Sequence, residues 1–151
     1  MKRNPNVRRT LDGALRWPGI DVLEYKPEGS APFRDVTRQL LFDDPAIACQ
    51  LRYFEIAAGG YSTLERHEHA HAVMIARGSG SCLIGTEVFE LGLHDLVTVP
   101  RLTWHQFRAA PSTPLGFLCM VNRERDRPQL PTARELEELR AQPRVAAFIR
   151  G

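Results

Sequence analysis

The chain has 151 residues, of which 43% are hydrophobic and 25% charged, proportions typical of one globular domain that buries a real core. Its 18 arginines and two lysines are scattered, and the formal net charge is only +2, so we expect no nucleic-acid partner. No apolar run reaches the ~20 residues of a membrane helix, and the basic N-terminus lacks the apolar run of a signal peptide. We therefore expect a cytoplasmic protein with no membrane partner.

The first 35 residues are rich in proline, glycine and charge, with one short strand candidate in "IDVLEY". We interpret residues 1–35 as an N-terminal extension that lies over the domain or reaches a partner subunit.

Residues 36–124 have a different texture, with short strand-like runs about ten residues apart, a spacing that suits a β-sandwich or barrel. Gly85-Thr86 separates two of these runs in the way that a two-residue hairpin with glycine first requires. The runs are VTRQLLF, IACQLRYFEI, HAVMIAR, SCLIG, EVFEL, DLVTVP, WHQFRA and LGFLCMVN.

Residues 125–151 break the pattern and predict a short helical tail. Thr132 stands three residues before Glu135, which predicts a capping box, and Leu136 and Leu139 then share one helical face. Pro143 can begin a second short helix.

The segment "ERHEHAH" holds four candidate ligands in alternation, namely Glu65, His67, His69 and His71. One interpretation is a solvated polar loop. Another is a zinc-protease helix, because residues 67–71 formally satisfy His-Glu-x-x-His, but that motif works only inside a substantial helix and the flanking glycines argue against one. A third is an extended segment, in which residues two apart share a face.

The extended interpretation lets Glu65 and His67 project together, with His71 reaching the same point from the next strand. His105, on another alternating strand candidate, is the obvious further donor. We therefore predict a metal site formed by Glu65, His67, His71 and His105, with His69 as the rival of Glu65.

These residues resemble the motifs of the cupins, which are small jelly-roll barrels. The first cupin motif runs glycine, five residues, His-x-His, three or four residues, glutamate, six residues, glycine. Here Gly59, Glu65, His67, His71 and Gly78 reproduce the spacing without a gap. Glutamate replaces the first histidine, and histidine replaces the glutamate, as it does in cupins with four-histidine sites.

The second cupin motif runs glycine, five residues, Pro-x-Gly, two residues, histidine, three residues, asparagine. This chain has His94, Pro100, Leu102, His105 and Ala109 at those positions, so the proline and the metal-binding histidine match. The resemblance implies an all-β fold, a double-stranded β-helix or jelly-roll barrel of the single-domain, type-2 kind. It covers roughly residues 47–121.

A carboxylate with three imidazoles suits Fe(II) or Mn(II), which we favour, and also Zn(II) or Ni(II). The resemblance implies an enzyme that acts on a small organic molecule, with dioxygenase-like chemistry ahead of isomerase, decarboxylase or lyase chemistry. His69 is the candidate catalytic acid or base. A ligand-binding module without turnover, and a structural metal, are the alternatives.

Around the metal, we expect apolar walls from Trp104 or Phe107 and from Met74, Phe117 or Met120. Arg52, Arg66 and Arg101 are candidates for steering an anionic substrate. The three cysteines are odd in number and widely spaced, so neither a disulfide framework nor a cysteine zinc site is predicted. Because small barrels expose strand edges, we expect a homodimer.

Overall fold

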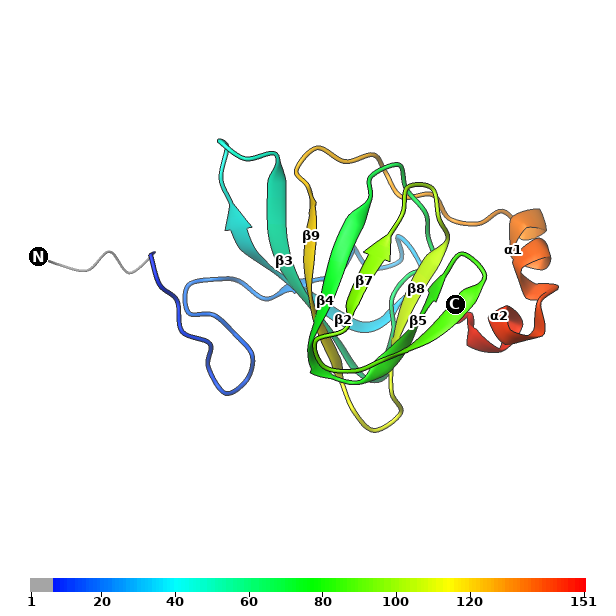
Figure 1. Cartoon of the computed structure of the whole chain (residues 1–151), viewed down its shortest axis with the longest axis horizontal. Helices are drawn as coiled ribbons and strands as arrows, with labels where there is room; N and C mark the ends of the chain where they lie inside the picture. The colour runs from blue at the N-terminus through cyan, green and yellow to red at the C-terminus, as the bar shows by residue number, and fades with distance from the viewer. Residues whose placement is uncertain (1–6) are drawn as a thin grey trace, which may run out of the picture.

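A computed structural model describes residues 7–151 and shows a curled, antiparallel sheet with two short helices at its C-terminal end (Figure 1). Its strands are β1 (Leu23–Glu24), β2 (Arg34–Asp43), β3 (Cys49–Tyr61), β4 (His71–Gly78), β5 (Gly80–Ile84), β6 (Glu87–Leu91), β7 (Leu96–Val99), β8 (His105–Ala109) and β9 (Leu115–Asn122). The helices are α1 (Ala133–Arg140) and α2 (Pro143–Phe148). The all-β prediction is confirmed.

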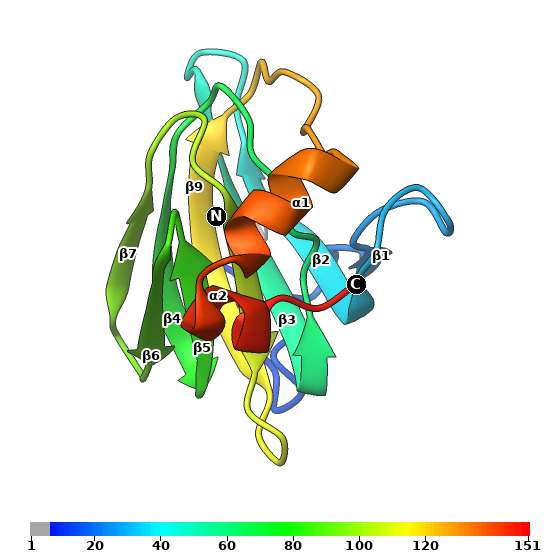
Figure 2. The ribbon, with the colours of Figure 1, turned by 90° about the vertical axis from the view of Figure 1, so that its right-hand side faces the viewer.

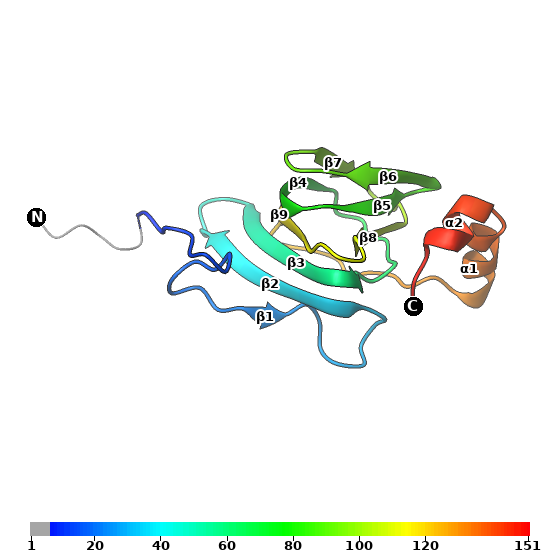
Figure 3. The same ribbon diagram turned by 90° about the horizontal axis from the view of Figure 1, so that it is seen from below.

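The sheet curls into half a barrel whose strands follow the order β6-β5-β8-β3-β9-β4-β7, with β2 and β1 continuing from β3. Seen from below, β2 and β3 lie along one side and β4 to β7 along the other (Figure 3). Period-two alternation explains the concave core, since Phe54, Phe117 and Ile75 occupy one row across β3, β9 and β4. All three side chains are buried there.

The C-terminal helices cover the outer face of the β5–β8 side (Figure 2). The predicted capping box is present, because Thr132 and Glu135 bond each other's backbone N–H groups. Val145 and Phe148 pack against Leu83 in a second apolar cluster. Within the described residues, no helix combines the length and the apolar character that a membrane crossing requires.

The N-terminal segment lies on the outer face of β2 and β3. The ring of Trp17 meets that of Tyr53 edge-on at 5.3 Å, and the Gln39 amide donates to the carbonyl of Leu15 at 3.1 Å. Strand β1 then pairs with β2, which carries Tyr25 toward the concave side.

Two glycines hold turns in the left-handed region, which side chains with a Cβ rarely adopt. Gly85 (φ 65°) opens the two-residue hairpin between β5 and β6, as the sequence predicts. Gly78 (φ 69°) ends β4, and a Cβ there would lie 1.7 Å from the carbonyl oxygen of Pro114. At Gly85 the nearest atom would be 3.7 Å away, so the two sites share the backbone strain and differ in steric overlap.

We predict that Gly78→Ala lowers the free energy of unfolding by about 3 kcal/mol or more, because the strain of a left-handed alanine adds to a clash with backbone. Gly85→Ala is the matched control and should cost only about 1–2 kcal/mol. Urea unfolding of both variants measures the difference. Equal losses would show that the contact with Pro114 contributes nothing.

Candidate metal centre

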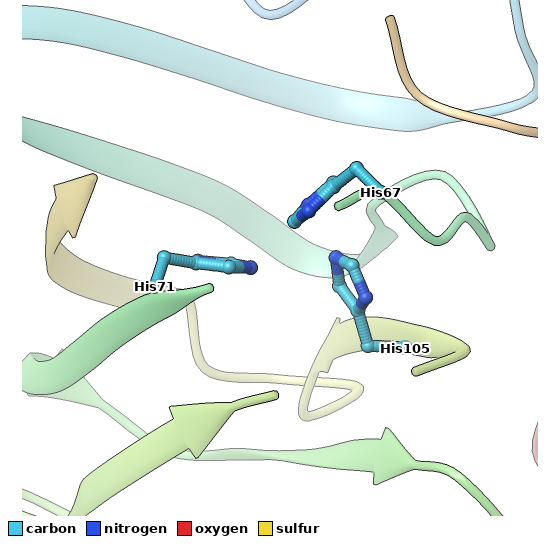
Figure 4. Close-up of side chains that lie close together, drawn as sticks. All are labelled: His67, His71 and His105. Atoms are coloured by element: carbon cyan, nitrogen blue, oxygen red, sulfur yellow. The ribbon is translucent and has the colours of Figure 1, made fainter. Parts of the chain in front are cut away.

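Three imidazoles from separate segments converge on the concave face. His71 begins β4 and His105 begins β8, whereas His67 lies in the connection from β3 to β4. Figure 4 shows their rings pointing toward one another, and one ring nitrogen of each lies within 4.8 Å of the other two. Residues 67–71 form no helix, so the zinc-protease arrangement is not built.

The backbone around the site explains this convergence. Glu65 and His105 form an antiparallel bridge, in which each N–H donates to the other's carbonyl, at 3.1 and 3.0 Å. The Leu102 N–H donates to the carbonyl of His67 at 2.7 Å. The two motif segments are therefore bonded to each other beside the three converging imidazoles.

Hydrogen bonds from Nδ1 determine which ring nitrogen of each histidine faces the middle of the cluster. Nδ1 of His67 donates to the carbonyl of His69 at 2.7 Å, and Nδ1 of His105 donates to that of Thr103 at 2.9 Å. Both rings therefore present an Nε2 lone pair. Nε2 of His71 is buried and has no hydrogen-bond partner among the described residues. An orphaned buried ring nitrogen is costly, and a bound cation would satisfy it in the tautomer that carries the proton on Nδ1.

Burial also keeps the three rings neutral, as metal ligands must be. It lowers the pKa of His71 to about 2 and that of His105 to about 4. The pKa of His67 is lowered as well, first by burial and then by the charge of His69. Neutral imidazoles with converging lone pairs fit a divalent metal ion.

The carboxylate of Glu65 stands in the same pocket but outside the group of converging nitrogens. It is ion-paired with Lys26, and the Tyr25 hydroxyl lies 3.5 Å from its other oxygen. The structure thus brings together His67, His71 and His105, with Glu65 beside them and its charge matched by an ammonium group. Glu65 as a metal ligand stays a prediction.

His69 also lines the pocket, stacked on the ring of His67 with centroids 3.7 Å apart. Its Nδ1 lies 2.7 Å from an oxygen of Asp126. Burial acts to raise the pKa of Asp126, but hydrogen bonds from the backbone N–H groups of Glu68 and His69 prevail and lower it to about 2. Asp126 is therefore ionised. It orients the ring of His69 through Nδ1, so Nε2 is the nitrogen of His69 that is left for other contacts.

Sequence reasoning missed Cys119, a thiol only 1% exposed that lines the same pocket. Its Sγ lies 3.4 Å from Nδ1 of His71 and 3.8 Å from Nη2 of Arg52. Burial raises the pKa of this thiol, and the positive charge of Arg52 opposes that shift. Alternation along β9 places Cys119 on the face of Phe117 and Val121, which was the available signal.

The pocket is a cavity of about 270 Å³, close to the lower end of the ~300–1,000 Å³ usual for small-molecule sites. Phe107 and Phe117 line it as predicted, together with Phe54. Trp104 instead packs toward the C-terminal helices. Met74 and Met120 are 43% and 54% exposed, so the prediction that they line the barrel is wrong.

Comparisons with known proteins agree with this geometry. The family model for the cupin domain matches residues 52–121. A curated relative from Rhodospirillum rubrum, "1-methylthio-D-xylulose 5-phosphate methylsulfurylase", is 57% identical over 95% of this chain and 92% of its own.

Two solved structures are similar over nearly the whole chain. A cupin 2 conserved barrel domain protein from Rhodopseudomonas palustris is 57% identical, with a TM-score of 0.90 over 95% of this chain and 99% of that one. A cupin-2 domain protein from Rhodospirillum rubrum is 56% identical, with a TM-score of 0.85 over 93% and 94%. By its fold, its histidine site and these relatives, the chain belongs to the cupin superfamily.

Proposed function

We propose that this protein is a metal-dependent enzyme that removes the methylthio group from a 1-methylthio-ketopentose phosphate, the kind of reaction named for the Rhodospirillum rubrum relative. The observation that carries the proposal is one small pocket in which three imidazoles and the Cys119 thiol meet. Identity of 57% over 95% of the chain supports the same substrate class.

His67, His71 and His105 would hold the metal, with Glu65 or His69 as the further ligand. A divalent ion in this place supplies Lewis-acid polarisation of the substrate's carbonyl oxygen. Imidazole ligands suit Mn(II) or Fe(II), which we favour, as well as Zn(II) or Ni(II). Lys26 balances the charge of Glu65, so the ligand set around the ion is close to neutral overall.

Cys119 is the group in this pocket that can accept a methylthio unit. Its thiolate attacks the sulfur of the substrate, so an S–S bond forms and the bond between that sulfur and C1 breaks. The released electron pair passes through C1 to the neighbouring carbonyl oxygen, and C1 then takes a proton. The products are a 1-deoxyketose phosphate and a methyl disulfide on Cys119. A small thiol from solution exchanges with that disulfide and restores the enzyme.

Thiolate is the nucleophilic form, and burial of Cys119 disfavours it, while the groups that face Sγ oppose that effect. Nη2 of Arg52 and Nδ1 of His71 both face Sγ and can donate to the anion. With Glu65 as the further metal ligand, His69, oriented by Asp126, is our candidate for the group that delivers the proton to C1.

Dioxygenase-like chemistry is the second candidate, because three imidazoles beside a carboxylate also suit iron and O₂. Oxygen consumption that depends on substrate would favour it. Methyl disulfide formation without oxygen uptake would favour removal of the methylthio group.

For the metal, we predict that His105→Ala lowers the metal content of the purified protein severalfold or more, because it removes one of three converging donors. The barrel should stay folded by circular dichroism. His94→Asn is the matched control: His94 is exposed and has a φ of 70°, which asparagine tolerates. Elemental analysis gives the comparison, and unchanged metal in His105→Ala would remove this residue from the ligand set.

For the thiol, we predict that Cys119→Ser lowers kcat by on the order of a thousandfold or more, because a hydroxyl cannot take up the methylthio group. Wild-type protein mixed with substrate and no added thiol should gain one methylthio group on the peptide that contains Cys119. Cys49→Ser, half-buried and outside the pocket, should turn over normally. Mass spectrometry and kinetics test both, and full activity of Cys119→Ser would exclude the thiol step.

A further inference from the structure

Three arginines from different segments line the same pocket as the imidazole cluster. Arg38 and Arg52 come from β2 and β3, where the register places them on the concave face beside Phe54. Arg125 comes from the segment that follows β9. We call Arg38, Arg52 and Arg125 the arginine cluster.

The cluster carries positive charge that the protein does not neutralise. Within residues 7–151, none of its three guanidinium groups forms an ion pair, although Arg77, Arg123 and Lys26 each have a carboxylate partner. Nε of Arg52 is also buried without a hydrogen-bond partner in the described part of the chain. Burial, and then the charges of Arg52 and Arg38, lower the pKa of Arg125. Mutual repulsion of this kind is relieved by a bound anion.

The segment that carries Arg125 is fixed across the pocket. The carboxylate of Asp126 in this segment accepts hydrogen bonds from the backbone N–H groups of Glu68 and His69, at 2.8 and 3.3 Å. Further on, Gln129 pairs with Arg66 through both backbone groups, at 3.1 and 2.8 Å. Nη1 of Arg125 itself donates to Gln50 and to the carbonyl of Asn122, both at 2.8 Å.

The sequence offers three arginines that could steer an anionic substrate, and the structure leaves one of them in the pocket. Arg66 is paired with Glu135, and Arg101 is exposed and outside the pocket lining. Of the three predicted arginines, Arg52 faces the pocket. Its Nη2 lies 3.8 Å from Sγ of Cys119, and its charge acts on Arg125, so Arg52 connects the thiol to the cluster.

We propose that the arginine cluster is the binding site for a phosphate monoester, and that it orients a phosphorylated substrate with its other end toward the imidazoles and Cys119. This rests on the proposed function, because it assigns the second half of the same pocket. Guanidinium groups match phosphate oxygens with paired, charge-assisted hydrogen bonds. The pocket's lysine, Lys26, is occupied by Glu65, which leaves phosphate recognition to the arginines.

Binding of inorganic phosphate tests the site without any reaction. Calorimetric titration of the metal-loaded protein should show that Arg38→Gln and Arg125→Gln each weaken phosphate binding roughly tenfold, and the double variant more. Arg134→Gln is the control, because Arg134 is exposed and pairs with Glu138 on α1. His105→Ala, titrated in the metal-poor state in which it should purify, should still bind phosphate. Unchanged affinity in the double variant, or loss of binding in His105→Ala, would overturn the proposal.

Kinetics separate this inference from the proposed function. With a 1-methylthio-ketopentose phosphate, the double variant should raise KM roughly tenfold to a hundredfold, with a much smaller change in kcat. The dephosphorylated ketopentose should be a poor substrate for wild type and equally poor for the variant. Equal turnover of the phosphorylated and dephosphorylated ketopentose would refute the phosphate-binding role of the arginine cluster. It would not contradict the proposed reaction. Phosphate binding through the cluster without removal of the methylthio group would refute the proposed reaction. It would still support the phosphate-binding role of the cluster.

Discussion

The backbone bridge between Glu65 and His105 is the constraint on which the rest of the site depends. Two N–H groups and two carbonyls, from segments forty residues apart in the chain, bond each other directly beneath the imidazoles. Because His67 lies two residues past the bridge and is itself bonded to Leu102, small errors in either segment would separate the nitrogens. The three imidazoles are therefore positioned by the backbone hydrogen bonds of this bridge and of Leu102, and burial keeps the rings neutral.

The glycine positions of the two cupin motifs show how much of the fold the sequence pattern predicts. Gly59 and Gly78 have positive φ, and so do His94 and Leu102, which stand where the cupin motif has glycine. The left-handed turns are thus retained although two of the four glycines are lost, at a cost on the order of 1–2 kcal/mol each. Spacing alone was enough to predict the fold, because the turn geometry depends on the position and tolerates another residue.

Other parts of the pocket could not be predicted from a single sequence. Cys119 and Cys82 both lie on apolar strands and are both buried, and only the pairing of β9 with β3 and β4 shows which one meets His71. Asp126 bonds His69 from 57 residues away, a contact without a local signal. Met74 is a different case: His71 and Ile75 face inward, so alternation by itself predicts that Met74 faces outward.

The pocket contains three kinds of group: neutral donors, a carboxylate–ammonium pair, and guanidinium groups without a carboxylate partner. Neutral imidazoles and a thiol line part of the pocket, and Glu65 and Lys26 pair beside them. The guanidinium groups of the arginine cluster line the same pocket from β2, β3 and the segment after β9, and they form no ion pair among the described residues. Arg52 takes part in both groups, since it contacts Sγ of Cys119 and repels Arg125. An anion bound at the cluster would reduce the positive potential that stabilises the thiolate. Arg52 opposes the burial of the Cys119 thiol more strongly than Arg125 does, and Arg38 is not among the groups that act on this thiol. A substrate whose phosphate engages Arg38 and Arg125 more closely than Arg52 would therefore preserve most of that stabilisation.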